Sequence, residues 1–150
     1  MNIRSASKND VPAIVAMLAD DKLGSLRENY KTPLPEQYYK AFTNIDNDPN
    51  QELYVIENEA SEITGTFQLS FIQYITYKGG IRAQIEAVRI HKAHRNKGLG
   101  EKAFLWAIER AKEKGAHLIQ LTTDKKRPEA LRFYEKLGFT ASHEGLKLHF

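Results

Sequence analysis

A short cationic and glycine-rich segment, His94-Arg95-Asn96-Lys97-Gly98-Leu99-Gly100, is the part of the sequence best suited to bind an anion. It follows an apolar run, IEAVRI, and precedes a helix-forming segment. Amides in the first turn of a helix lack an intrahelical partner, and the helix dipole adds positive potential, so such a junction attracts phosphate. Gly98 and Gly100 let the backbone approach closely, and Arg95 and Lys97 add positive charge. The segment therefore predicts a pyrophosphate-binding loop.

Another interpretation of this segment stays open. A tight turn between a strand and a helix, with its cations in water, would also use glycine. Two known phosphate loops do not fit. The P-loop needs a lysine and a serine or threonine after its second glycine, and the dinucleotide fingerprint needs a glycine where Ala103 stands. An anion site here would therefore be of a different kind, and the plain turn remains the alternative.

Glu86 is the best candidate for a general base. It lies in the middle of the apolar run, between Ile85 and Ala87, so we expect it to be buried. A carboxylate in an apolar site becomes a stronger base, which is useful for accepting a proton near neutral pH. The alternative is a glutamate at an edge or bonded to water that only orients a substrate.

The composition indicates a globular protein with one core. The chain has 150 residues, 41% of them apolar and 27% charged, and it has no cysteine, which excludes a disulfide framework and thiol catalysis. The N-terminal segment lacks the apolar stretch of a signal peptide, and no apolar run is long enough to span a membrane. We expect a cytoplasmic protein that forms a single domain over residues 1–150.

The charges are unevenly distributed, although the net charge is only +3. Residues 1–62 contain 6 Lys and Arg against 11 Asp and Glu, a balance of −5, whereas residues 78–114 contain 10 against 4, a balance of +6. Solvated faces explain most individual charges. The segregation nevertheless favours an anionic ligand near the middle of the chain and a cationic one near its N-terminal part.

Residue patterns predict helices and strands with one parallel strand pair. Ser7 with Asp10 three residues later is typical of a helix start. We expect strands over 3–5, 52–58, 65–76, 81–90 and 117–123, helices over 8–20, 36–45, 99–114 and 129–137, and two short strands in 139–150 that meet near Glu144. The strand–helix–strand unit of residues 81–123 implies a parallel crossover inside an otherwise antiparallel sheet.

Residues 95–100 also match the R/Q-x-x-G-x-G/A motif of the GNAT superfamily of N-acetyltransferases, in which the motif holds the pyrophosphate of acetyl-CoA. Three further segments resemble the family in the expected order: IEAVRIHKAHR its fourth strand, HLIQLTT its fifth, and ALRFYEKLGF its closing helix and strand. The resemblance is specific over residues 81–140. It implies an α/β (α+β) fold with a mixed, mostly antiparallel sheet, helices on both faces, and a parallel strand pair that splays apart to bind acetyl-CoA.

The resemblance also implies which residues bind the coenzyme. In the family a bulge interrupts the fourth strand, and the pantetheine arm bonds to the strand backbone in the resulting gap. The residues implied are Val88, Ile90, Arg95, Asn96, Lys97, Gly98, Leu99, Gly100, Arg127, Ala130 and Phe133. Arg127 stands where the family usually has asparagine, so it either reaches a coenzyme phosphate or lies in water. Because it precedes Pro128, we expect it at the start of the last helix.

The activity implied is transfer of an acetyl group from acetyl-CoA to a primary amine of a small molecule or peptide by direct attack. The family often has a glutamate base at the position of Glu86, acting directly or through water. It often has a tyrosine at the position of Tyr134, beside the coenzyme sulfur, where it serves as an acid. Tyr134 also lies on an apolar helix stripe, so a packing role is the alternative. A coenzyme A-binding module without turnover, a protein or peptide acetyltransferase, and a nucleic-acid binder remain as other functions.

The acceptor is the part of the function that the sequence specifies least. The family builds the acceptor pocket from its first helices and central strands, so Tyr30, Tyr39 and Gln73 are candidates, although packing explains each of them too. We expect no metal, because cysteine and an H-E-x-x-H pattern are both missing. We expect no nucleic-acid or membrane partner. Trp106 either packs in the core or contacts a second copy in a homodimer.

Overall fold

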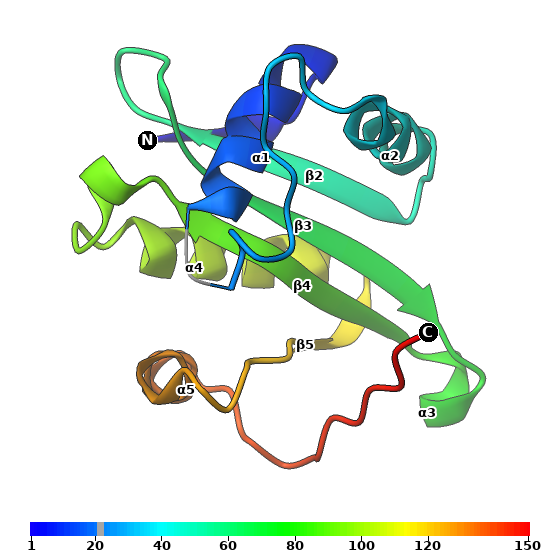
Figure 1. Ribbon diagram of the computed structural model, residues 1–150. Helices are drawn as coiled ribbons and strands as arrows, with labels where there is room; N and C mark the ends of the chain where they lie inside the picture. Colours follow the sequence, from blue (N-terminus) through cyan, green and yellow to red (C-terminus); the bar gives the residue numbers. More distant parts are fainter. Residues whose placement is uncertain (21–22) are drawn as a thin grey trace.

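The computed structural model describes residues 1–20 and 23–150, and its central feature is a five-stranded sheet in the order β1-β2-β3-β4-β5. Figure 1 shows α1 and α2 on one face of this sheet and α4 on the other. The elements in chain order are β1 Asn2–Ser5, η1 Lys8–Asp10, α1 Val11–Ala19, α2 Glu36–Asp46, β2 Gln51–Glu57, β3 Ile63–Gln73, α3 Thr76–Gly79, β4 Ile81–Ile90, η2 Lys92–His94, α4 Leu99–Glu113, β5 Ala116–Gln120 and α5 Pro128–Lys136.

The sheet is mixed, as the sequence predicts. β1 to β4 pair antiparallel, and β4 pairs parallel with β5 through the crossover helix α4. The parallel ladder ends at the pair Gln84–Gln120, although β4 continues to Ile90. A bulge lies in this part of β4, which β5 no longer flanks; there Ala87 has a φ of 54° and the register with β3 shifts. The expected splay between the two strands is therefore confirmed.

Both faces of the sheet are buried by helices. On the α4 face, Phe67 and Leu69 of β3 pack with Phe104 of α4, and on the other face Val55 packs with α1 and α2. Trp106 belongs to the first cluster, because its ring lies 4.7 Å from that of Tyr54 between ring centroids. The central strands β2 and β3 are thus covered on both sides, and β3 supports β4 through their antiparallel ladder.

An ion pair attaches α4 to the sheet. The Arg110 guanidinium donates to both carboxylate oxygens of Glu52 on β2, at 2.7 and 3.0 Å, and the Tyr54 hydroxyl donates to the same carboxylate at 2.7 Å. Burial and this hydrogen bond raise the pKa of Tyr54 to about 12. A two-point arginine–carboxylate contact fixes direction as well as distance, so it holds the helix that carries the glycine-rich loop.

The predicted strands extend beyond the observed ones by three residues or more at three places. β3 ends at Gln73 rather than at 76, because the Gln73 amide bonds to the carbonyls of Tyr74 and Gly79 and closes a turn that contains α3. β5 ends at Gln120 rather than at 123, where its parallel partner diverges.

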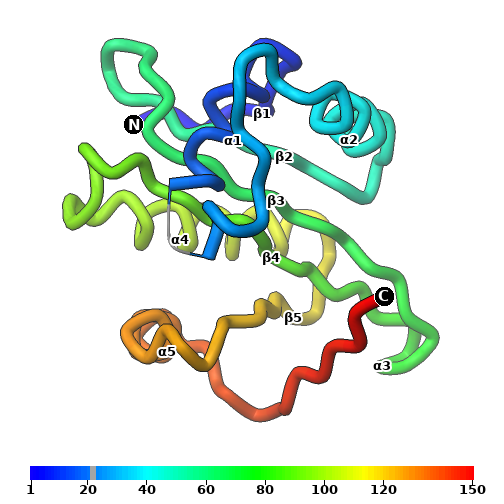
Figure 2. The backbone as a smooth tube through the Cα atoms, viewed as in Figure 1, coloured from blue at the N-terminus to red at the C-terminus, as the bar shows by residue number. Residues whose placement is uncertain are grey.

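The tail is the third difference. The two strands predicted in residues 139–150 are wrong, since this segment, red in Figure 2, has no strand. Leu146 and Leu148 are 93% and 80% exposed. Alternating apolar residues form a strand only where another strand pairs with the backbone, and the tail has no such pairing in the described residues. Among those residues, the structure contains no helix of the length and apolar character that crossing a membrane requires.

Candidate functional site

The glycine-rich loop connects β4 to α4 and has the backbone of an anion site. Gly98 is the N-cap of α4 with a φ of 74°, a conformation that glycine adopts without strain, and Asn96 also has a positive φ of 61°. Residues 95–98 are exposed. A methyl group added at Gly98 would meet no atom within 4 Å, so the space beside the loop is open. The amides of Leu99 and Gly100 open the helix, where they have no intrahelical partner.

The two loop cations are held by the protein. Arg95 donates from Nε to the carbonyl of Ile90 at 3.0 Å and pairs with the carboxylate of Asp20 at 3.1 Å. Lys97 donates to the carbonyl of Ala93 at 3.1 Å. Sequence reasoning missed Asp20, because nothing in the pattern places the end of α1 beside this loop. A bound anion would compete with Asp20 for Arg95.

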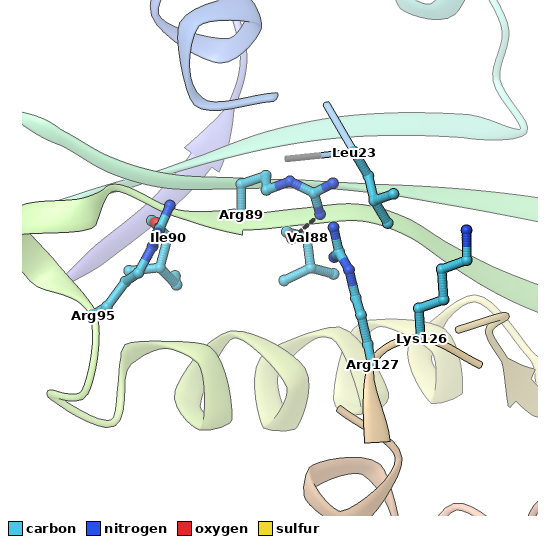
Figure 3. Close-up of a pocket in the computed structure, with 7 residues that line it drawn as sticks. All are labelled: Leu23, Val88, Arg89, Ile90, Arg95, Lys126 and Arg127. Carbon is cyan, nitrogen blue, oxygen red and sulfur yellow. Dashed lines mark hydrogen bonds between the residues drawn. The ribbon is translucent and has the colours of Figure 1, made fainter. Parts of the chain in front are cut away.

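A cavity of about 620 Å³ lies between β4, the loop and the segment before α5. Figure 3 shows its lining, in which cations dominate and, among the described residues, no carboxylate takes part: Leu23, Val88, Arg89, Ile90, Arg95, Lys126 and Arg127. Of the predicted coenzyme residues, Val88, Ile90, Arg95 and Arg127 meet here. The sequence reasoning did not include Leu23 and Arg89. Strict alternation from Ala83 and Ile85 would have placed Arg89 on the core face; the bulge at Ala87 reverses the faces, so the sequence pattern could not have found it.

Glu86 is exposed, so the prediction that it is buried is wrong. The physical reason is the splay: Glu86 pairs with Gln68 of β3 on one side but lies beyond the last pair with β5, so β5 does not flank it on the other side. A chain of amides reaches it from the paired part of the sheet. Gln120 donates to Gln84 at 2.8 Å, and Gln84 donates to the Glu86 carboxylate at 2.7 Å. An ionised carboxylate only accepts hydrogen bonds, so this chain has a fixed direction.

Tyr134 of α5 lies at the edge of the α4 core. Its ring is 5.4 Å from that of Phe104 between centroids, and it is partly buried. Burial raises the pKa of its hydroxyl above the usual 10; the charges of Arg127 and Arg89 act to lower it, and that of Glu86 acts to raise it. The hydroxyl therefore stays protonated at neutral pH and lies near all three charges.

The start of α5 is supported by packing against α4. Phe133 contacts Phe104, with ring centroids 5.6 Å apart, and its ring lies 3.9 Å from the position that a Cβ on Gly100 would occupy. Arg127 is the N-cap of α5, as the sequence predicts, and Ala130 donates its amide to the Arg127 carbonyl at 3.1 Å. These contacts place Arg127 opposite Val88.

The three predicted acceptor residues are not brought together. Tyr30 lines a second cavity of about 690 Å³ beside α1. Tyr39 packs in the cluster between α1 and α2, with the Lys8 ammonium 5.6 Å from its ring centroid. Gln73 closes the turn after β3. In the part of the chain that the structure describes, no group of three or more His, Cys, Asp or Glu side chains could hold a metal.

Comparison with known proteins identifies the family. The model of the acetyltransferase (GNAT) family matches residues 17–139, which is well over half of the chain. The chain belongs to the GNAT acetyltransferase family. The GNAT motif predicted from the sequence thus forms the loop between β4 and α4. The splayed strand pair that the resemblance implied is β4 and β5, and it lies beside this loop.

Three relatives of this GNAT chain have informative names. The aminoalkylphosphonate N-acetyltransferase of Salmonella typhimurium is 27% identical over 142 residues, which cover 94% of this chain and 86% of the relative. A transcriptional regulator from Bacillus halodurans C-125, known from its crystal structure, is 58% identical in sequence to this chain. The two structures superpose with a TM-score of 0.95 over 99% of both chains. A predicted acetyltransferase from Clostridium acetobutylicum, solved with acetyl-CoA, is 22% identical with a TM-score of 0.75 over 99% of this chain and 95% of that one, and shows the same fold.

Proposed function

We propose that this GNAT protein is an N-acetyltransferase that uses acetyl-CoA and a primary amine. The observation that carries the proposal is the edge of β4 that faces β5: from Ile85 to Ile90 this edge runs past the end of the β5 ladder, while the other edge stays paired with β3, and the strand leads into the loop at Gly98. An extended amide-containing arm can bond to such a strand as an added strand does. Its diphosphate then meets the amides that open α4.

The residues present fit acetyl-CoA in both parts of this site. Val88 and Ile90 offer backbone groups along the cavity, and residues 95–100 surround the open space at the start of α4. Arg127 lines the same cavity, and we assign Ala130 and Phe133 beside it on α5 to the coenzyme, where packing on α4 holds them in place. When bound, acetyl-CoA supplies a thioester, whose carbonyl carbon is open to attack by an amine.

Glu86 and Tyr134 are the side chains assigned to proton transfer. As the amine nitrogen bonds to the acetyl carbon and the carbon–sulfur bond breaks, the nitrogen loses a proton and the sulfur leaves as a thiolate. We assign the proton from nitrogen to Glu86, reached directly or through water, which its exposure allows. Tyr134 gives its proton to the thiolate, and burial keeps its hydroxyl protonated for this step.

Nucleic-acid binding is the second candidate, because the Bacillus halodurans relative is named a transcriptional regulator. The net positive charge of residues 78–114 favours nucleic-acid binding, but the contacts of these cations within the fold weaken that argument. On α4, Arg110 pairs with Glu52 and Lys112 pairs with Glu109, and Lys114 just beyond the helix lies 3.5 Å from Glu52. These cations serve contacts within the fold, which leaves fewer of them for a phosphate backbone.

A thiol-release assay tests the proposal. Purified protein is incubated with acetyl-CoA and a panel of primary amines, and both free thiol and the acetylated amine are measured. We expect both products in equal amounts. Thiol release at the same uncatalysed rate with wild type and with the Glu86→Gln/Tyr134→Phe double variant would instead support a coenzyme-binding module. Salt-sensitive retention on heparin with none on a coenzyme A column would support nucleic-acid binding.

A further inference from the structure

The cavity contains more positive charge than the coenzyme loop explains. Arg95, Lys97 and the start of α4 lie at the loop, where a diphosphate would bind. Arg89 lies on β4 and Arg127 at the start of α5, and neither belongs to the loop of residues 95–100. Figure 3 shows the Arg127 side chain extending toward Val88 from the α5 side while Arg89 extends from the strand itself. Two guanidinium groups that enter one cavity from opposite walls form an environment suited to an acid.

Arg89 is also close to the proposed base. Arg89 pairs with Thr66 of β3, and Glu86 pairs with Gln68 of the same strand. Thr66 and Gln68 are two residues apart and lie on one face of β3. Because of the bulge in β4, Arg89 and Glu86 therefore also lie on one face of the sheet. Two strand residues span about 7 Å. One face of β4 therefore presents an acidic and a basic side chain at the spacing of the two ends of a small molecule.

Tyr134 connects these groups to the reaction. Arg89 and Arg127 line the same cavity, and their charges and that of Glu86 all act on the Tyr134 hydroxyl, so the three side chains lie within electrostatic range of that point. In the proposed function this point is where the thiolate leaves. A molecule held between Glu86 and Arg89 would thus have one end beside the reacting carbonyl.

We propose that the amine acceptor carries an acidic group, a phosphonate or carboxylate a few bonds from the nitrogen, and that Arg89 and Arg127 bind this group while Glu86 receives the amine. This inference rests on the proposed function. It refines the expectation of a simple cationic amine that the acidic N-terminal part raised. Arg89 donates to the Val88 carbonyl at 2.9 Å, and both arginines have further interactions within the chain, so the acid adds to these contacts or exchanges with them.

Two amines of the same shape test the inference. Aminoethylphosphonate carries the acid, and neohexylamine has an uncharged tert-butyl group in its place; β-alanine tests whether a carboxylate serves equally. We expect kcat/KM for aminoethylphosphonate to exceed that for neohexylamine at least tenfold, because hydrogen bonds to charged groups discriminate strongly. Equal use of the two amines would overturn the inference.

A variant identifies the group that discriminates. Arg89→Gln should raise KM for aminoethylphosphonate at least tenfold and collapse the preference over neohexylamine, while the affinity for acetyl-CoA in calorimetry stays within threefold. Arg132→Gln is the matched control, since Arg132 is an exposed arginine on α5, and it should leave the preference intact. A preference unchanged in Arg89→Gln, or a large loss of acetyl-CoA affinity, would overturn the role of Arg89.

Direct binding separates this inference from the proposed function. Aminoethylphosphonate is titrated into protein saturated with coenzyme A, with and without Arg89→Gln. If no amine releases thiol, the proposed function fails, but binding that needs Arg89 still supports the acid site. If neutral amines release thiol and no binding of aminoethylphosphonate is measured, the acetyltransferase stands and the acid site is refuted.

Discussion

Tyr134 offers the cleanest test at the scale of single residues, because one atom separates its two roles. Tyr134→Phe keeps the ring against Phe104 and removes only the hydroxyl. If the hydroxyl protonates the thiolate, kcat should fall about a hundredfold while acetyl-CoA affinity in calorimetry stays the same. An unchanged kcat, measured where chemistry limits the rate, would leave Tyr134 as a packing residue.

Glu86 calls for a different measurement, since its exposure lets it act either on the proton or on the position of the ammonium group. Glu86→Gln keeps the size of the side chain and one carbonyl acceptor. A base role predicts that kcat at neutral pH falls about a hundredfold and that the rise of rate with pH on the acidic side disappears. A purely orienting role predicts a higher KM for the amine with the acidic rise still present. Full pH profiles of both proteins decide between the two.

At the scale of elements, the start of α4 has two glycines that the structure distinguishes. Gly98 has a φ of 74°, where an alanine is strained by about 1 kcal/mol or more, whereas Gly100 is helical and its added methyl group would lie 3.9 Å from Phe133, an ordinary contact. Gly98→Ala should weaken acetyl-CoA binding at least tenfold, or about 1.4 kcal/mol. Gly100→Ala is the matched control and should change it less than threefold. Calorimetry that finds equal losses would contradict this distinction.

At the scale of the whole molecule, Asp10 makes the free energy of unfolding depend on pH in the acidic range. Two hydrogen bonds from Arg4, at 2.7 and 3.1 Å, and one from the Ser7 amide lower the pKa of Asp10 from 3.8 to about 2, against the opposing effect of burial. The carboxylate is therefore easier to protonate in the unfolded chain. Its contribution is complete above pH 4 and is lost as the pH falls through 2.

Asp10→Asn tests this contribution. The shift corresponds to about 2 kcal/mol of unfolding free energy at neutral pH, since each pKa unit is worth about 1.4 kcal/mol. In urea unfolding, the variant should lose this amount at pH 7 and much less at pH 2. Asp46→Asn, at an exposed position of α2, should behave as wild type at both pH values. An equal deficit at pH 2 and pH 7 would argue against the ion pair as the cause.

The sequence by itself determined the parts of this protein that depend on neighbours in the chain. A β-rich run followed by glycines, cations and a helical stripe specifies β4, the loop and α4, since close backbone approach and free helical amides are local properties. The crossover to β5 follows because connections of this kind are right-handed and parallel. The family resemblance supplied the splay, Tyr134 and the coenzyme residues, which spacing alone does not specify.

Only the tertiary structure decided which groups meet in space and which are exposed. The position of Glu86 beyond the end of the β4–β5 ladder exposes a residue whose apolar neighbours predict burial, because exposure depends on the next strand and not on the flanking residues. Likewise, Asp20 reaches Arg95 only because α1 ends beside the loop. The pairing of Arg89 and Arg127 across one cavity joins positions from two elements, and such contacts arise from packing over long separations in the chain.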